Sequence, residues 1–344
     1  MALLERMLSD QEGQSALHRP TEFWRQASAS IVEDLRRSGL GTFRTLSSCR
    51  SFFVPSYGPP GNALSEADVS ALKQTMLKHH PASSKAFATL TEALDGTSWA
   101  LSDYRVYLAG DLPHAAPDLS VITESNRGGP PDQHTFDGRN FSRSMLNYLH
   151  GLVFLKQQLG NLDGFRFLEI GGGFGTLGEI LCQSGHYSYI DVDIPPTAAV
   201  ASWYLSGVEG NRVSTYTDTA EQHEILVPER GEQLVLCPWQ LESVRGQVDI
   251  LWNYISFQEM EPPVVRFYLQ QGKRLGARFV LLRNLREGKQ RQTSQNPLGV
   301  LQPTTSEDYD DLLEGYVLRA SNVHPFGFRT VDGFHSELRL YEKR

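Results

Sequence analysis

The sequence predicts an α/β protein in which a doubly wound, mostly parallel sheet follows a mainly helical N-terminal cap. Three observations predict this fold class. From residue 142 onward, short apolar segments alternate with helical patterns, as in strands joined by crossover helices. A glycine-rich turn directly follows the first of these apolar segments. Before residue 140, helical patterns are separated by polar, Pro- and Gly-rich loops.

The N-terminal part is predicted to be a helical cap or lid. Helical patterns cover residues 21–37, 65–80 and 84–94, and the second begins at Ser65, a residue type that caps helix N-termini. Residues 111–140 are rich in Pro, Gly, Asp and Asn, and a loop of this length is typical of a lid or binding segment. We therefore predict a cap at 1–140 and a sheet domain at 141–344.

The sheet domain is expected to begin with a helix over residues 142–159, where apolar residues recur at helical spacing. Strands are expected at 165–170, 187–193, 234–237, 248–254 and 277–282. Helices are expected at 176–182, 198–205 and 264–275. Residues 315–321 are expected to return the chain from helix to strand, ahead of a final strand at 335–341.

Composition narrows the class of function. The 344 residues carry a formal charge of −8, so the chain lacks the broad basic face that nucleic-acid binding requires. The three cysteines are far apart, and the N-terminus carries charges where a signal peptide has an apolar core. No apolar run approaches the roughly 20 residues that span a bilayer. We expect a cytoplasmic protein that binds a small molecule, not nucleic acid or membrane, with homo-oligomer formation left open.

A glycine-rich segment, Glu169–Gly175, fits the pattern E-x-G-x-G-x-G between a strand and a helix. Side chains at these glycines would keep a ligand from lying against the backbone and the helix N-terminus. The same stretch contains the dinucleotide pattern G-x-G-x-x-G at Gly173, Gly175 and Gly178. A dinucleotide therefore remains an alternative ligand, as does a turn that binds nothing.

Two features favour S-adenosylmethionine (SAM) over a dinucleotide. Glu169 stands where a dinucleotide-binding strand usually has an apolar residue, and a carboxylate there can organise the ammonium and sulfonium of SAM. The G-x-G-x-x-G register begins four residues after this carboxylate, so the helix would begin too late. Asp193, which closes the next strand, can accept both ribose hydroxyls and so indicates a nucleoside of either kind.

The run LEIGGGFGTLGEIL followed by YIDVDIPP resembles motifs I and II of the class I SAM-dependent methyltransferases. The segments FSRSMLNYLHGLVFL, NYISFQEMEPP and NPLGVL are similar to a bacterial group labelled sugar O-methyltransferases, and the resemblance covers most of residues 120–344. It implies a Rossmann-like sheet with helices on both faces, and an enzyme that transfers a methyl group from SAM to a small molecule.

The resemblance also implies where the cofactor binds. The methionine end, the ribose, the adenine edge and the transferring methyl are expected along the ends of the first four strands, in that order. The residues implied are Glu169, Gly171, Gly173, Gly175, Asp193, Ile194, Trp239, Gln240 and Asn253.

Two acceptor chemistries remain open. An oxygen acceptor usually needs a base or a metal, whereas a carbon acceptor forms a carbocation that aromatic faces stabilise and a carboxylate deprotonates. A SAM-binding protein without catalysis is a third alternative.

The chain is also similar to the geranyl diphosphate C-methyltransferases of benzastatin-type terpenoid biosynthesis. This similarity implies that Arg127 grips a diphosphate with Mg²⁺, that Glu169 removes the proton after methyl addition, and that Tyr57 covers the acceptor. Glu169 has cofactor orientation as an alternative role. We expect C-methylation of an isoprenyl diphosphate, with O-methylation of a sugar or another polar natural-product hydroxyl as the alternative.

Overall fold

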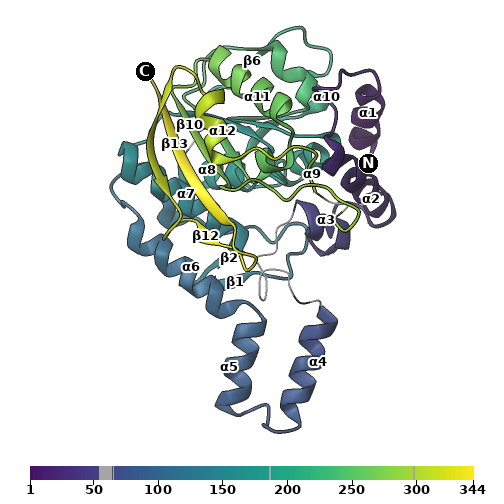
Figure 1. Ribbon diagram of the computed structural model, residues 1–344, viewed down its shortest axis with the longest axis vertical. Coiled ribbons are helices and arrows are strands. Elements are labelled where there is room, and N and C mark those ends of the chain that lie inside the picture. Colours follow the sequence, from purple (N-terminus) through teal and green to yellow (C-terminus); the bar gives the residue numbers. More distant parts are fainter. Residues whose placement is uncertain (54–63, 65, 186, 297–298) are drawn as a thin grey trace.

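The computed structural model describes residues 1–53, 64, 66–185, 187–296 and 299–344. Among these residues, a nine-stranded sheet has the order β11-β13-β10-β9-β3-β4-β7-β5, and β12 pairs with β13 (Figure 1). The strands are β3 (Arg166–Ile170), β4 (Ser188–Val192), β5 (Arg212–Ser214), β7 (Glu232–Leu236), β9 (Ile250–Tyr254), β10 (Phe279–Leu285), β11 (Tyr316–Asn322), β12 (Phe328–Arg329) and β13 (His335–Lys343). Two small sheets pair β1 (His134–Phe136) with β2 (Arg139–Phe141), and β6 (Ile225–Leu226) with β8 (Val244–Arg245).

The helices lie before, between and after these strands. They are α1 (Ala2–Gln11), α2 (Glu22–Ser38), η1 (Phe43–Thr45), α3 (Ser47–Phe52), α4 (Glu66–Leu77), α5 (Lys85–Leu94), α6 (Thr97–Gly110), η2 (Leu119–Val121), α7 (Arg143–Leu159), α8 (Thr176–Gly185), α9 (Pro195–Leu205), α10 (Tyr216–Thr219), η3 (Pro238–Ser243), η4 (Ser256–Glu259), α11 (Pro262–Arg274) and α12 (Ser306–Leu312). None of the described helices is long and apolar enough to cross a membrane.

Strand directions locate a crevice at one edge of the sheet. Strands β5, β7, β4, β3, β9 and β10 are parallel, and β13 runs antiparallel between β10 and β11. Strand β4, which follows β3 in the chain, lies on one side of β3, while β9 lies on the other. This reversal of strand order leaves a crevice beyond the carboxyl ends of β3 and β9, where ligands of open α/β sheets bind.

The two faces of the sheet bury separate hydrophobic cores. Along β3, Phe167 joins the core formed with α7, α8 and α9, whereas Leu168 and Ile170 join the core formed with α11 and α12. Successive side chains of a strand point to opposite faces, so an apolar strand such as β3 needs cover on both sides. The predicted α/β fold with helices on both faces is confirmed.

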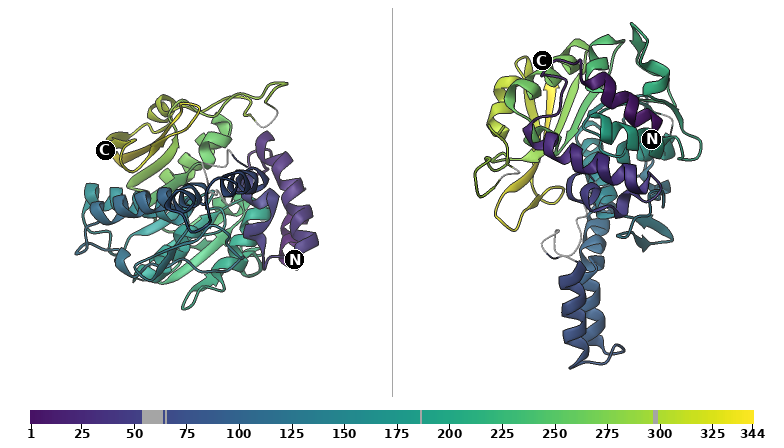
Figure 2. Two further views of the ribbon diagram at one scale, coloured as in Figure 1. Left: turned by 90° about the horizontal axis from the view of Figure 1, so that it is seen from below. Right: turned by 90° about the vertical axis from the view of Figure 1, so that its right-hand side faces the viewer.

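The N-terminal helices pack onto this body. Met7 of α1 and Ile31 of α2 belong to the same core as Ala198 and Leu205 of α9. Helices α4 and α5 form a hairpin that projects away from the body, as Figure 1 and the right-hand view of Figure 2 show. Because both sides of residue 140 contribute to one core, the domain boundary there stays a prediction.

Several local elements follow directly from the sequence pattern. The predicted helices at 21–37 and 142–159 are confirmed, and the hydroxyls of Ser84 and Ser142 cap α5 and α7 by accepting N–H groups of their first turns. The β1–β2 hairpin was not predicted within 111–140. Its turn contains Asp137 and Gly138, both at positive φ, and Asp-Gly is a typical hairpin signal.

Candidate active site

A cavity opens at the crevice beyond β3 and β9. Its floor is the glycine loop, Gly171–Gly173, and its side is the end of β4 with Asp193 and Ile194. The segment after β9 contributes Ile255, Ser256, Glu259 and Met260, and Ser144, Asn147 and Thr176 complete the polar part. The remaining lining residues are aromatic: Trp24, Phe52, Phe53, Tyr148, Phe174 and Tyr254.

Two different structural reasons explain why glycine occupies the positions of this loop. A Cβ on Gly171, which has a φ of +74°, would overlap Oγ of Ser256, and a Cβ on Gly172 would overlap the carboxylate of Asp191. At Gly173, with a φ of +65°, a Cβ would meet only the Phe53 carbonyl oxygen, at 3.5 Å. The first two glycines are therefore required by the packing of the protein, while the third leaves its backbone open to the cavity.

Hydrogen bonds join the glycine loop to the end of β4. The N–H of Gly173 donates to Oδ2 of Asp193 over 2.9 Å, and the N–H of Gly172 donates to Oδ1 of Asp191 over 3.2 Å. Gly175 does not line the cavity and packs against α9 instead. A Cβ at Gly175 would lie 2.7 Å from Cγ of Leu205 on α9. The loop is thus fixed between β4 and α9 before any ligand arrives.

Three carboxyl groups surround the floor of the cavity. Burial raises the pKa of Asp193 to about 7, although the N–H groups of Ile194 and Gly173 act in the opposite direction. Burial, with the nearby charges of Asp193 and Glu169, raises the pKa of Asp191 well above its usual range. Oδ2 of Asp191 has no hydrogen-bond partner among the described residues.

Glu169 is the third carboxyl group, and it is fully buried. Its Oε1 accepts a hydrogen bond from the Tyr148 hydroxyl over 3.0 Å, and its Oε2 accepts one from the Tyr189 hydroxyl over 2.6 Å. Burial raises the pKa of Glu169 to about 8 despite these two donors. Only Tyr148, of these three residues, lines the cavity.

The electrostatic character of the cavity is acidic. Among its described lining residues, Asp193 and Glu259 are acidic, and none is a lysine, arginine or histidine. Glu259 is paired with Lys289, whose Nζ lies 2.6 Å from Oε1. No lysine, arginine or histidine lies beside Asp193 in the described cavity wall. A cationic ligand would therefore balance the negative charge of the Asp193 carboxylate.

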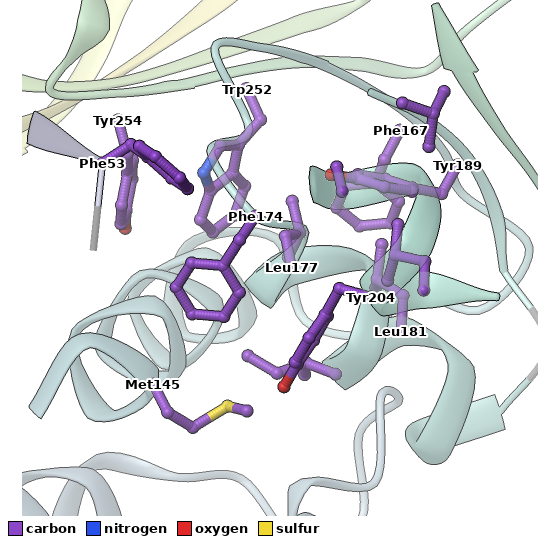
Figure 3. Packing of buried hydrophobic residues seen from close by; sticks show 14 of the residues in the cluster. Phe53, Met145, Phe167, Phe174, Leu177, Leu181, Tyr189, Tyr204, Trp252 and Tyr254 are labelled. Carbon is purple, nitrogen blue, oxygen red and sulfur yellow. The ribbon is translucent and has the colours of Figure 1, made fainter. Parts of the chain in front are cut away.

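Aromatic rings form another part of the cavity wall and pack against rings behind it. Figure 3 shows Phe53, Phe174, Trp252 and Tyr254 gathered around the N-terminal end of α8 and the adjoining part of α7. Phe174 packs edge-on against Tyr204 with ring centroids 5.1 Å apart, and Tyr254 lies 4.6 Å from Trp252. These contacts hold the apolar wall in one arrangement.

Backbone strain marks the end of β9. Ile255 has a φ of +68°, a conformation that is a genuine outlier for a β-branched residue. It lines the cavity, and its N–H donates to the carbonyl of Arg283 over 2.7 Å. Strain of this kind persists only where surrounding contacts fix it, and it clusters at functional sites.

Four of the nine residues expected to bind the cofactor line this cavity: Gly171, Gly173, Asp193 and Ile194. Glu169 and Gly175 lie directly behind it. Asn253 is fully buried, and its amide donates to the Ile170 carbonyl and to Ser256. Trp239 and Gln240 lie beyond β7, where Trp239 donates to the hydroxyl of Tyr216 and Gln240 to that of Thr219. Tyr57 lies outside the described residues.

Arg127 does not reach the cavity. Its guanidinium lies 4.0 Å above the ring of Trp203 and donates to the Trp203 carbonyl over 2.9 Å, on the α9 side of the glycine loop. No group of three or more His, Cys, Asp or Glu side chains is placed to hold a metal ion in the described part of the chain. These residues therefore supply no such ligand group for the predicted Mg²⁺.

Sequence reasoning missed the wall contributed by the cap and α7. Trp24 comes from α2, Phe52 from α3 and Phe53 from the position directly after α3, all more than 100 residues before the glycine loop. No local pattern in the sequence indicates that they lie there. Tyr148 and Asn147 carried a usable signal. They lie in the segment FSRSMLNYLHGLVFL, which resembles known methyltransferases. The resemblance by itself implies no role for the polar residues of this segment.

No family model matches the sequence, and no curated protein matches it. Solved structures of low similarity include magnesium protoporphyrin IX methyltransferase from Synechocystis PCC 6803 with bound SAM, at 14% identity and a TM-score of 0.38, covering 58% of this chain and 81% of that one. A SAM-dependent methyltransferase from Leishmania major has 9% identity and a TM-score of 0.42, covering 70% and 83%. The pyocyanin biosynthetic protein PhzM has 15% identity and a TM-score of 0.36, covering 55% and 53%.

Proposed function

We propose that the protein is a SAM-dependent methyltransferase that acts on a small molecule. One observation carries this proposal: a cavity floored by bare glycine backbone and lined by carboxylates, with no basic residue among its described lining. Glu169 and Asp191 add two more carboxyl groups directly behind that floor. A floor of this composition favours a cation, such as the ammonium or sulfonium of SAM, over a phosphate at the same position.

The residues at the floor fit SAM better than a dinucleotide. SAM carries an ammonium and a sulfonium, which the acidic groups stabilise, whereas the pyrophosphate of a dinucleotide would lie against Asp193 without a countercharge. The carboxylate of Asp193 is held by two backbone N–H groups in a position to accept ribose hydroxyls. When bound, SAM supplies the methyl group, and the residues of this chain orient it and exclude water.

For the acceptor, we propose an apolar carbon of an isoprenyl diphosphate such as geranyl diphosphate. The aromatic wall supports this choice, because ring faces stabilise the carbocation that forms when a methyl group adds to an alkene. A second cavity shares Phe52 with the first, and the side-chain amides of Gln290 and Asn296 in its lining can donate to an anionic end. Its lining also contains Asp332 and Lys289, and Lys289 is paired with Glu259. Methylation of a sugar hydroxyl is the alternative, supported by Ser144, Asn147 and Ser256 in the first cavity.

Calorimetry with SAM, S-adenosylhomocysteine and NAD tests the cofactor. We expect both SAM and S-adenosylhomocysteine to bind, NAD not to bind, and Asp193→Asn to weaken SAM binding by roughly tenfold or more. The matched control is Asp311→Asn, which removes an exposed carboxylate on α12 and should leave SAM affinity unchanged. Binding of NAD with no binding of SAM would overturn the proposal.

Mass spectrometry tests the acceptor. Incubation with SAM and geranyl diphosphate is expected to give a product heavier by one CH₂, and a parallel reaction contains UDP-glucose in its place. Repeating both with EDTA shows whether a divalent ion is needed. Methylation of the nucleotide sugar and not of geranyl diphosphate would reverse the order of the two acceptors while leaving the methyltransferase assignment intact.

A further inference from the structure

Glu169, the carboxylate that sequence reasoning assigned as the base, has no exposed surface. Two tyrosines cover it. Tyr189, from β4, is fully buried, whereas Tyr148, from α7, is only partly buried and lines the cavity. An acceptor in the cavity can therefore meet Tyr148 but cannot meet Glu169 directly.

Other lining groups are already engaged. The two oxygens of Asp193 accept the N–H groups of Gly173 and Ile194, and the carboxylate of Glu259 is paired with Lys289. No histidine is among the described residues that line the cavity. The Tyr148 hydroxyl, 3.0 Å from Oε1 of Glu169, joins the cavity to a buried proton acceptor.

We propose that Tyr148 receives the proton that leaves the acceptor and passes its own hydroxyl proton to Glu169. This inference rests on the proposed methyltransferase function. As the methyl–sulfur bond breaks, a bond forms between the methyl carbon and the acceptor, which becomes positively charged. The acceptor then loses a proton to the Tyr148 oxygen, the original O–H bond of Tyr148 breaks, and that proton bonds to Oε1 of Glu169. The products are the methylated acceptor, S-adenosylhomocysteine and a neutral Glu169.

The arrangement suits a relay. A tyrosine alone is a poor base near neutral pH, because its usual pKa is about 10 and its hydroxyl stays protonated. It can accept a proton only if it gives up its own at the same time, and Glu169 is the acceptor for that second proton. The ring of Tyr148 is held parallel to Trp252 at 6.1 Å and packs against Tyr254 at 5.0 Å, which fixes the hydroxyl toward Glu169.

The groups around Glu169 determine its pKa. Burial and the charge of Asp193, which follows β4, favour the protonated form of Glu169, while Tyr148 and Tyr189 donate to the carboxylate and favour the ionised form. Burial raises the pKa of Glu169 to about 8, which brings it close to that of a tyrosine. Glu169 accepts the proton only when it is ionised, a form that the cationic groups of SAM favour when they bind beside it.

Three variants test the relay. Tyr148→Phe and Tyr189→Phe each remove one hydrogen bond to Glu169, but only the first removes a group from the cavity, and Glu169→Gln removes the proton acceptor. Calorimetry with SAM comes first, followed by S-adenosylhomocysteine formation with whichever of geranyl diphosphate and UDP-glucose the wild-type protein methylates. The infrared band of the protonated carboxyl, identified by its loss in Glu169→Gln, reports the titration of Glu169 independently of turnover.

We expect both Tyr148→Phe and Tyr189→Phe to raise the pH at which Glu169 ionises. Only Tyr148→Phe is expected to lower kcat by about 100-fold or more, with SAM affinity within about threefold of wild type, and Tyr189→Phe by much less. The double variant Tyr148→Phe/Glu169→Gln should be no slower than either single variant, because the two residues act as one unit. Wild-type kcat in Tyr148→Phe, or an equal loss in Tyr189→Phe, would overturn the relay. Failure of the wild-type protein to bind SAM would instead count against the proposed function itself.

Discussion

Gly171 and Ser256 touch so closely that no side chain fits between them: a Cβ on Gly171 would overlap Oγ of Ser256. The same hydroxyl donates to the carbonyl of Ile170 over 3.0 Å, so the end of β3 and the segment after β9 are fastened together at the floor of the cavity. The glycine that a sequence motif assigns to cofactor binding is thus also needed to close the protein's own structure.

Gly171→Ala should therefore cost more than the backbone penalty alone. The backbone at a φ of +74° disfavours alanine by about 1 kcal/mol, and the overlap with Ser256 adds roughly 1–3 kcal/mol. Gly160→Ala is the matched control, because Gly160 has a φ of +77° and open space around it. Urea unfolding of both variants measures the difference, and equal destabilisation would mean that the loop moves aside from Ser256 at no cost.

The fold could be predicted from the sequence further than the site could. The alternation of strands and helices, the glycine loop after the first strand and Asp193 at the end of the next are local patterns, so the α/β class and the elements could be predicted. No local pattern predicts the strand order of the sheet. The cavity wall depends on tertiary contacts. Phe53 reaches the glycine loop only because the segment before it packs against the core, and a pattern read along the chain contains no such contact.

The role of Arg127 also depends on a tertiary contact that the sequence pattern does not contain. A basic residue in a glycine-rich loop upstream of the cofactor motif is a reasonable anion ligand in sequence terms, but its guanidinium stacks on Trp203. Glu169 shows the opposite case. Its position at the strand end was predictable, while its complete burial under Tyr148 depends on where α7 crosses β3.

Arg127→Ala is expected to lower stability and leave SAM affinity unchanged. The substitution removes a cation–π contact at 4.0 Å and one hydrogen bond to the Trp203 carbonyl, together about 1–2 kcal/mol. Arg127→Lys keeps the charge but loses the planar stacking, so it should restore only part of the stability. Thermal unfolding and calorimetry with SAM measure the two effects. A stable Arg127→Ala protein whose KM for geranyl diphosphate rises steeply would instead support the diphosphate role.

The free protein is expected to lose stability as the pH rises from about 5 to 8. Burial raises the pKa of Glu169 to about 8 and that of Glu179 to about 7, so the folded state keeps protons that the unfolded state has already released. Unfolding then releases protons, and the free energy of unfolding falls with increasing pH, by on the order of 1 kcal/mol or more. Urea unfolding at pH 5.5 and pH 8 measures the slope.

Glu169→Gln should reduce this pH dependence without abolishing it, because glutamine does not titrate whereas Glu179, Asp191 and Asp193 still do. Glu229→Gln, at an exposed position, is the control and should keep the wild-type slope. Saturating SAM should also reduce the slope, since its cationic groups stabilise the ionised carboxylates. A wild-type slope in Glu169→Gln would show that other groups carry the pH dependence.

A buried ion pair links the cap to the start of α7. Nη2 of Arg44 lies 2.7 Å from Oε1 of Glu124, and Glu124 also accepts the hydroxyl of Ser142, the N-cap of α7. Both charged side chains are almost completely buried, so removal of Glu124 leaves the buried Arg44 with only Asp132, whose Oδ1 is 4.0 Å away. Glu124→Gln is expected to destabilise the protein by about 3–5 kcal/mol.

The Arg36–Glu5 pair, at 2.6 Å but about half exposed, supplies the comparison. Arg36→Gln should destabilise the protein far less than Glu124→Gln, since solvent screens an exposed pair. The double variant Arg44→Met/Glu124→Met should recover much of the loss seen in Glu124→Gln, because it removes both buried charges together. Thermal unfolding of the four proteins separates these cases. If Glu124→Gln cost as little as Arg36→Gln, water would have to reach Arg44, and the segment that carries Phe53 to the cavity would be less firmly held than its buried contacts imply.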